Sequence, residues 1–257
     1  MIVRKSARDI EAMRAAGKLV ARCLREISEF IVPGQTTTMD VDVYAESLVN
    51  KYGVIGSFKG YRGYPNTICV AVNEEVVHGI PGNRILSAGD IVGLDLGLIV
   101  DGWHADSAIT VAVGGECLPE AARLMKVTRE ALYKGIEQAR PGKRIGDIGY
   151  AIQSYVEKHG YSVVRALVGH GVGKRLHEEP NVPNYGRPKT DVKLEEGMTL
   201  AIEPMVNMGS YEVETLADKW TVVSKDRSLS AHFEHTVAIR KNGPDILTID
   251  TPEADKI

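Results

Sequence analysis

Four stretches of the chain carry hydrophobic residues at helical spacing. The first ends just before Pro33-Gly34, a pair that stops helices. The pattern predicts helices over residues 9–31, 39–51, 119–139 and 145–159. We expect Thr38 to cap the second helix and Gly53 to follow its end, since threonine and glycine are typical of those two positions.

Shorter apolar runs predict strands. Residues 67–72 and 75–78 have strand composition and follow a loop rich in Gly and Tyr at 61–65. Apolar residues also flank the stretch 95–106 on both sides, and Asp101-Gly102 within it is typical of a hairpin turn. We therefore expect two antiparallel strands joined by a tight turn there. A strand, a histidine-rich loop and two strand pairs should follow the last helix, and residues 251–257 should form a tail.

Two aspartates of this hairpin, Asp95 and Asp106, are expected on one face of the sheet. A turn at residues 100 and 101 places them directly opposite, and a turn at 101 and 102 places them diagonally, because side chains alternate with a period of two. Their carboxylates are then about 4.5 to 8 Å apart. Two divalent metal ions shared between them would offset the cost of burying like charges. The alternative, an aspartate in the turn or facing water, is the better interpretation of Asp101.

The order of elements repeats along the chain. Pro33-Gly34 recurs 108 residues later, and the run from Leu86 to Asp95 recurs at the same offset, ending at Glu203. The stretch His104-Ala-Asp106 is answered 128 residues later by His232-Phe-Glu234. Two related halves, about 10–115 and 119–240, would bring four acids to an approximate twofold axis within a single catalytic domain, 1–257.

Composition limits the partners of the protein. The 257 residues are 44% hydrophobic and 25% charged, with a net charge of -3, so neither nucleic acid nor an anionic membrane is indicated as a partner. The three cysteines lack the spacing of a disulfide scaffold or a zinc knuckle, which favours a reducing compartment. The sequence shows no signal segment and no apolar run long enough to span a bilayer, so we expect a cytoplasmic protein.

The sequence Gly169-His170-Gly171-Val-Gly173 contains a candidate metal ligand. Its glycines allow close approach of the backbone and leave the imidazole of His170 exposed to a site. The alternative is a tight turn whose histidine caps a neighbouring element. A phosphate-binding loop is excluded because Val168 and Arg175 stand where that motif needs Gly and a hydroxyl residue.

The roles expected for the other histidines depend on whether they lie near the acids. His78 and His177 each end an apolar segment before a Gly or Pro turn, and alone they are ordinary loop histidines; beside four acids they become catalytic candidates. Alternation along the strands places His104 and His232 on the face of the acids, as hydrogen-bond partners of the ligands. It places His235 on the opposite face.

Taken together, the motifs resemble those of one enzyme family. Asp95 follows Gly-Asp-Ile-Val, His170 lies in Gly-His-Gly-Val-Gly, Glu203 in Ile-Glu-Pro-Met and Glu234 in Phe-Glu-His-Thr, with Asp106 second in the order. This order, over nearly the whole chain, resembles the methionine aminopeptidases of the short bacterial type. The resemblance implies an α+β pita-bread fold in which helices cover antiparallel sheet in two halves related by a pseudo-twofold axis.

The resemblance also implies a site with two divalent metal ions, for which Co, Mn, Fe, Zn and Ni are all compatible. Asp106 and Glu234 would bridge the ions, Asp95 would hold one, and His170 with Glu203 would hold the other. The substrate pocket would comprise Tyr61, Tyr64, Cys69, His78, Leu176, His177 and Trp220. Two positions depart from the family pattern, since phenylalanine is often met at Leu176 and glutamine is expected at His232.

The implied reaction is removal of the initiator methionine from nascent proteins whose next residue is small. A hydroxide bridging the metal ions would attack, Glu203 would move its proton, and His177 and His78 would donate to the substrate. The resemblance implies a monomer that binds N-terminal peptides, with a ribosome contact as a further expectation. Two alternatives stay open: an Xaa-Pro aminopeptidase or dipeptidase on the same fold, and a silent pita-bread protein that binds peptides or ribosomes.

Overall fold

Capping side chains fix where the first two helices begin in the computed structural model, which describes residues 2–250. Ser6 caps α1 (Ala7–Phe30) and Thr37 caps α2 (Thr38–Tyr52), each in a reciprocal pair with an aspartate three residues on. The prediction of Thr38 as the cap was therefore wrong by one residue. The hydroxyl of Thr37 accepts from the backbone N–H of Asp40 at 3.1 Å, whereas Thr38 already belongs to the helix.

The other two long helices lie in the second half of the chain. They are α3 (Pro119–Ile136) and α4 (Ile145–Lys158). The expected end of α3 at residue 139 was three residues too late. The chain tightens there, since the N–H groups of Gln138 and Ala139 bond to carbonyls three residues back rather than four.

Strands make up most of the remaining regular structure. The first half contains β1 (Ile55–Gly56), the 3-10 turn η1 (Tyr61–Gly63), β2 (Cys69–Val72), β3 (Glu75–Val77), β4 (Ile91–Val100) and β5 (Trp103–Ala112). The second half contains β6 (Ser162–Val163), β7 (Gly169–Gly171), β8 (Glu178–Val182), β9 (Thr199–Ile202), β10 (Met205–Asn207), β11 (Val213–Thr215), β12 (Val222–Ser224), β13 (Ser230–His232), β14 (His235–Arg240) and β15 (Gly243–Ile246).

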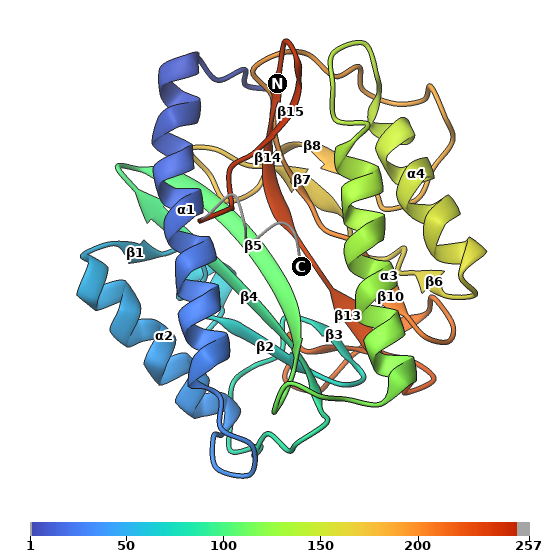
Figure 1. Cartoon of the computed structure of the whole chain (residues 1–257). Helices are drawn as coiled ribbons and strands as arrows, with labels where there is room; N and C mark the ends of the chain where they lie inside the picture. Colours follow the sequence, from blue (N-terminus) through green and yellow to red (C-terminus); the bar gives the residue numbers. More distant parts are fainter. Residues whose placement is uncertain (1, 251–257) are drawn as a thin grey trace.

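The strands pair antiparallel throughout the described chain, which agrees with the expected α+β class. One sheet runs β1-β4-β2 with β5 on β4, and another runs β15-β14-β9-β7-β8. Two smaller sheets, β13-β10-β6 and β11-β12-β3, complete the layer. At the centre, β5 and β14 lie side by side with α1 and α3 flanking them (Figure 1).

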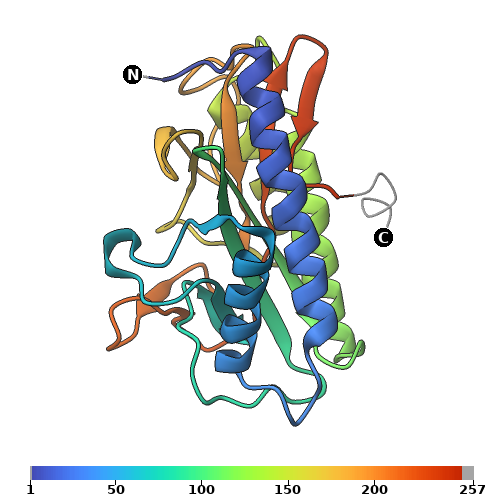
Figure 2. The same ribbon diagram turned by 90° about the vertical axis from the view of Figure 1, so that its left-hand side faces the viewer.

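Helices cover one side of the strands and leave the other side to loops. Turning the molecule shows α1 and α3 on the same side of the strand layer (Figure 2). In β4, Leu94, Leu96 and Leu98 are fully buried in a core shared with α1 and α2. A separate core joins α3 and α4 to β9 and β14. Because side chains alternate, Asp95 points away from the helices.

The central hairpin settles how its two aspartates face each other. Val100 pairs with Trp103, so the turn consists of Asp101 and Gly102, both with positive φ (51° and 74°). Asp95 pairs with Ala108, and Asp106 pairs with Gly97. Asp95 and Asp106 are therefore diagonal neighbours on one face, which is the second of the two expected geometries.

Strand pairing repeats in the two halves, and its register differs from the one predicted by comparing the two halves of the sequence. Gly93 pairs with Thr110, and Ala201, 108 residues after Gly93, pairs with Thr236. The offset of the second strand is thus 126 residues, so the expected offset of 128 was wrong. A slip of two residues keeps every side chain on its face, which is why the sequence pattern did not reveal it.

Hydrogen bonds between the halves follow the corrected register. The Thr236 hydroxyl donates to the Asp106 carbonyl at 2.8 Å and accepts its N–H at 3.0 Å. Thr110 makes the same two bonds with His232, at 2.7 and 3.0 Å. His232 is therefore the counterpart of Asp106, and Glu234 is the counterpart of Ala108. The backbones of Ala108 and Glu234 pair with each other at the approximate axis.

No helix within residues 2–250 combines the length and the apolarity needed to cross a bilayer. The tail expected at 251–257 lies outside the described residues.

The threonine bonds predict a stability effect at the junction of the halves. Replacing buried Thr236 with valine keeps the shape and leaves the Asp106 N–H and carbonyl without these partners. We expect a loss of about 1–3 kcal/mol in the free energy of unfolding, measured by urea denaturation. Thr110→Val should cost a similar amount, and Thr236→Ser, which retains the hydroxyl, should cost less. Wild-type stability in both valine variants would contradict this account of the junction.

Candidate metal centre

A cavity of about 620 Å³ opens on the side of the strands away from the helices. The four acids expected at the axis all line it, although they come from β5, from β4 and from the segments that join β9 to β10 and β13 to β14. The predicted metal ligand His170 and the two catalytic candidates, His78 and His177, line the same cavity. The fold thus brings the predicted acids and these histidines into one place.

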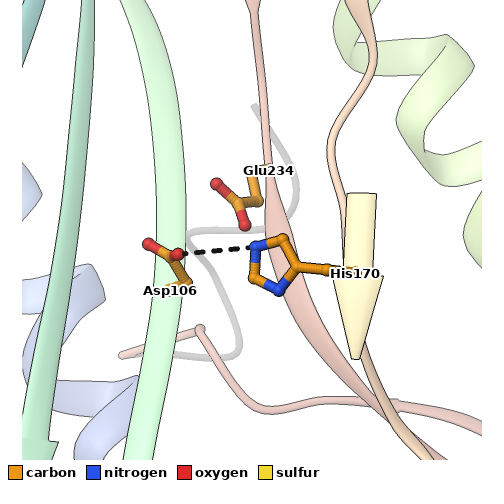
Figure 3. A group of neighbouring side chains, drawn as sticks. All are labelled: Asp106, His170 and Glu234. Carbon is orange, nitrogen blue, oxygen red and sulfur yellow. Dashed lines mark ion pairs between the residues drawn. The ribbon is translucent and has the colours of Figure 1, made fainter. Parts of the chain in front are cut away.

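The centre of the site is formed by Asp106, His170 and Glu234, whose side chains point toward one another (Figure 3). One possible ligand atom from each lies within 4.8 Å of the others. The distance from His170 Nε2 to Asp106 Oδ2 is 3.9 Å. All three residues are buried, at 4%, 6% and 2% exposure in chain order. Atoms at this spacing can share one cation.

Two glycines hold His170 in position. The residue lies in β7, between β8 and β9, rather than in the tight turn kept as an alternative. A Cβ at Gly169 would meet the Ala201 carbonyl oxygen at 2.4 Å, and one at Gly171 would meet that of Glu179 at 2.3 Å. The ring N–H at Nδ1 donates to the Gly171 carbonyl at 2.9 Å, so Nε2 carries a lone pair toward the acids.

Glu203 and Asp95 complete the set of acids. Glu203 directly follows β9, and its Oε1 lies 3.5 Å from His170 Nε2. Asp95 lines the cavity beside Asp106. Within residues 2–250, no group of three possible ligand atoms that lie within 4.8 Å of one another includes Asp95. Asp95 is therefore the most peripheral of the four.

Burial makes these acids hard to ionise. It raises the pKa of Asp106 to about 7, and burial followed by repulsion from Asp106 raises the pKa of Asp95 and Glu203 well above the ordinary range. The pKa of Glu234 is raised for the same reasons. In the described part of the chain, the ion pairs of these acids involve only histidines, and His170, whose pKa burial lowers to about 4, is neutral. Arg62 and Arg175 also line the cavity, but no arginine or lysine of residues 2–250 forms an ion pair with these acids.

Several buried polar atoms at the site have no hydrogen-bond partner in the described structure. They are Oδ1 of Asp95, Oδ1 of Asp106, Oε1 of Glu234 and Nε2 of His232. Buried polar atoms are normally satisfied, and oxygen donors with one or two imidazoles suit divalent cations such as Mn, Fe, Co and Zn. The residues present therefore fit the expected metal site.

At the rim, His177 packs between two rings. Its ring stacks on Tyr61 at 5.2 Å between centroids and lies 4.1 Å from the ring of His170. Burial against these neighbours, followed by repulsion from His170, lowers the pKa of His177 to about 3. The next residue, Glu178, is the first of β8; it is buried and accepts from Lys5 Nζ at 2.6 Å, which anchors the chain next to His177.

His78 also lines the cavity. Its φ of 58° is rare for a residue with a Cβ, and such conformations concentrate at functional sites. Gly79 follows it because a Cβ there would meet the Val70 carbonyl oxygen at 2.1 Å. The His78 ring contacts Trp220 edge to face at 6.4 Å, and burial lowers its pKa.

An apolar cluster lines the cavity next to the acids. It contains five of the seven pocket residues expected from the resemblance, all except the two histidines, namely Tyr61, Tyr64, Cys69, Leu176 and Trp220. It also contains Phe58 and Ile80, which the sequence did not point to. Phe58 also lines the cavity and is one of only three phenylalanines, but it stands between Ser57 and Lys59, outside the motifs that indicated the site. Burial raises the pKa of the Cys69 thiol well above its ordinary value, so the thiol stays protonated.

Of the remaining strand histidines, His235 points away from the acids, as alternation predicted, whereas neither His104 nor His232 makes the expected hydrogen bond to an acid in the described structure. Nε2 of His235 lies 3.2 Å from the Tyr133 hydroxyl, on the side of α3. Nδ1 of His104 lies 2.9 Å from the Ser57 hydroxyl, which satisfies that ring outside the group of acids. His232 points to the acids, and its Nε2 lies 3.8 Å from Glu203 Oε2.

Comparisons with known proteins agree with this geometry. The chain matches the model of metallopeptidase family M24 over residues 11–241. A methionine aminopeptidase of Clostridium acetobutylicum is 53% identical, over 97% of this chain and 99% of that relative. Methionine aminopeptidase 1 of Bacillus subtilis is 52% identical, over 96% and 99%.

Solved structures give the same result. The methionine aminopeptidase structure from Thermotoga maritima has a TM-score of 0.94 and 48% identity, and the match covers 97% of this chain and 100% of that one. A prolidase from Pyrococcus horikoshii has a TM-score of 0.79 and 24% identity, which is a likeness of fold alone. The match covers 98% of this chain but 65% of the prolidase.

The raised pKa of Asp106 predicts a pH effect in the metal-free protein. The folded pKa of about 7 exceeds the unfolded value of 3.8, so folding holds the proton more tightly. This contribution to stability is present below pH 4 and is lost as pH rises through 7. In the presence of a chelator, Asp106→Asn should therefore have a larger free energy of unfolding than wild type at pH 8. This difference should become smaller toward pH 4. Denaturation at both pH values measures it; a gap independent of pH would contradict the prediction.

Proposed function

The chain belongs to metallopeptidase family M24, and on that premise we propose that it is a metal-dependent aminopeptidase that removes an N-terminal methionine. The observation that carries the proposal is the convergence of four acids, two buried and two half-buried, and of His170 on one cavity beside an apolar pocket. The relatives named methionine aminopeptidase, at 52–53% identity over nearly the full chain, support this substrate. The catalytic unit proposed is a single domain spanning 1–257.

The proposed cofactor is a pair of divalent ions, with Co, Mn, Fe, Zn and Ni all compatible with the donors. Asp106 and Glu234 are proposed as the shared ligands, since both are the most buried of the acids and lie beside the axis. Asp95 would hold the first ion, and His170 with Glu203 the second. The spacing of 3.5 Å between His170 Nε2 and Glu203 Oε1 supports that last pairing.

Bound divalent ions at such a site acidify a water molecule and draw electron density from the scissile carbonyl. The chain's own residues would do the rest. Glu203 reaches into the cavity, and its side chain is 13% exposed, so it can take a proton from water and return it to the leaving amine. His177, as a neutral ring held by Tyr61, can donate to the carbonyl oxygen as negative charge grows there. His78, which lines the same cavity, is proposed to donate to the scissile amide.

Pocket shape accounts for the choice of residue. The apolar cluster provides aromatic faces from Tyr61, Tyr64 and Trp220 and a protonated thiol from Cys69. A thioether side chain is flexible and makes favourable contacts with aromatic rings, so methionine suits this lining. The acids that line the cavity attract a free α-amine. This attraction favours cleavage at the N-terminus of a peptide over cleavage within a chain.

The biological partners proposed are the N-terminal peptides of nascent proteins, bound by a monomer in the cytoplasm. A ribosome contact is part of the same proposal, because nascent chains emerge there. Neither a nucleic acid substrate nor a membrane partner is proposed, in keeping with the net charge of -3.

An activity comparison tests the substrate. The metal-loaded chain should release methionine from Met-Gly-containing peptides at least about 10³-fold faster than it cleaves Ala-Pro peptides, because this discrimination sums several pocket contacts. Amino-acid release followed by chromatography measures both. A preference for the Ala-Pro peptide would favour the Xaa-Pro alternative, and absence of cleavage with two ions bound would favour a silent binding protein.

A variant of His177 tests the proposed donor. His177→Ala should lower kcat by about 100-fold or more and leave the metal content unchanged, because the ring contacts His170 without being proposed as a ligand. Metal analysis alongside steady-state kinetics measures both quantities. His104→Gln is the matched control, since its ring is satisfied by Ser57, and it should retain activity. Equal loss of metal and rate in His177→Ala would instead move His177 into the ligand set.

A further inference from the structure

His232 occupies a position at the metal centre that hydrogen bonding does not explain. It is 3% exposed, and its Nε2 has no hydrogen-bond partner in the described structure. The nearest charged oxygen, Glu203 Oε2, lies 3.8 Å away, beyond hydrogen-bond length. A fully buried ring nitrogen aimed at acids is costly unless something in the cavity satisfies it.

The backbone of His232 is fixed from the other half of the molecule. Thr110 donates its hydroxyl hydrogen to the His232 carbonyl and accepts the His232 N–H, at 2.7 and 3.0 Å. These bonds are the counterparts of those that Thr236 makes with Asp106. The approximate twofold therefore places the His232 imidazole in the second half where the first half has the Asp106 carboxylate.

Glu203 lies between two imidazoles. Its Oε1 is 3.5 Å from His170 Nε2, and its Oε2 is 3.8 Å from His232 Nε2. Possible ligand atoms of Glu203, His232 and Glu234 lie within 4.8 Å of one another. Donors bound at about 2.1 Å to one ion can be up to about 4.2 Å apart, so both distances suit a shared ion.

We propose that His232 is a direct ligand, through Nε2, of the metal ion held by His170 and Glu203, which gives that ion two imidazole donors. The inference rests on the proposed function, because it presumes the metal centre. The family pattern has glutamine at this position, and an imidazole ligand in its place gives the site a softer set of donors. It favours Fe, Co, Ni and Zn over Mn, since imidazole suits the later metals.

The test counts imidazoles in the cobalt-loaded protein. Each histidine bound to Co(II) through one nitrogen carries an N–H on the other, and the paramagnetic ion shifts that proton far outside the normal NMR range. Wild type should show two such exchangeable signals, and His232→Gln should show one. His104→Gln, the matched control, should keep both, because its ring bonds Ser57.

Titration of the metal-free proteins gives a second measurement that does not depend on activity. His232→Gln should bind Co(II) about 10- to 100-fold more weakly and lose less affinity for Mn(II). Thermal melting of the metal-free variant checks that it folds. Should it fail to fold, His232→Asn, a smaller amide, replaces it in both measurements, and wild type alone still decides the number of signals.

Each outcome decides between the two proposals. One exchangeable signal in wild type, with unchanged Co(II) affinity in His232→Gln, would overturn the role of His232 and leave the metal centre intact. Absence of Co(II) binding by wild type would instead overturn the proposed function. Two signals in wild type that both persist in His232→Gln would assign the second signal to another histidine and would also reject the proposal.

Discussion

Repulsion between desolvated carboxylates is the constraint on which this structure depends. Four acids are held at one cavity, and the described chain sets only histidines in ion-pair reach of them. The fold supplies the free energy that keeps them together through the two hydrophobic cores, one in each half. The metal-free chain therefore stores electrostatic strain, and cations relieve it. The affinity for metal ions therefore follows from the packing that holds the acids together.

The two halves cooperate because neither can form the site alone. The first contributes Asp95 and Asp106, and the second contributes His170, Glu203 and Glu234. The hydroxyls of Thr110 and Thr236 join them by bonding across to the backbone beside the acids. A segment next to the cavity is also held by a residue far away in the sequence, since Lys5 forms an ion pair with Glu178, the neighbour of His177. Geometry at the rim thus depends on residues far away in the sequence.

Sequence periodicity predicted the site well where local rules apply. Alternation placed Asp95 and Asp106 on one face, the offset of 108 found Glu203, and the glycines identified His170. The pita-bread architecture expected from the resemblance is confirmed by the likeness to methionine aminopeptidase and prolidase structures.

Three features were not predicted from the sequence, and two of them depend on long-range contacts. The predicted offset of the second strand was two residues too large. A shift of two residues leaves every side chain on the same face, so the alternating pattern could not reveal the error. Phe58 and Ile80 join the pocket only through tertiary packing. Thr37 and Thr38 are both able to cap a helix, and only the geometry distinguishes them.

The backbone pairing of Ala108 with Glu234 bears on how such a molecule could arise. An ancestor made of two identical half-length chains would carry the same residue at both positions. Two alanines would leave the centre without its most buried acid, whereas two glutamates would add a second acid on the facing strand, with the two Cα atoms about 5.5 Å apart. Gene fusion removes this conflict, because a single polypeptide can keep an acid on one side of the axis and a methyl group on the other. Asymmetry at the axis is thus a benefit of joining the halves covalently.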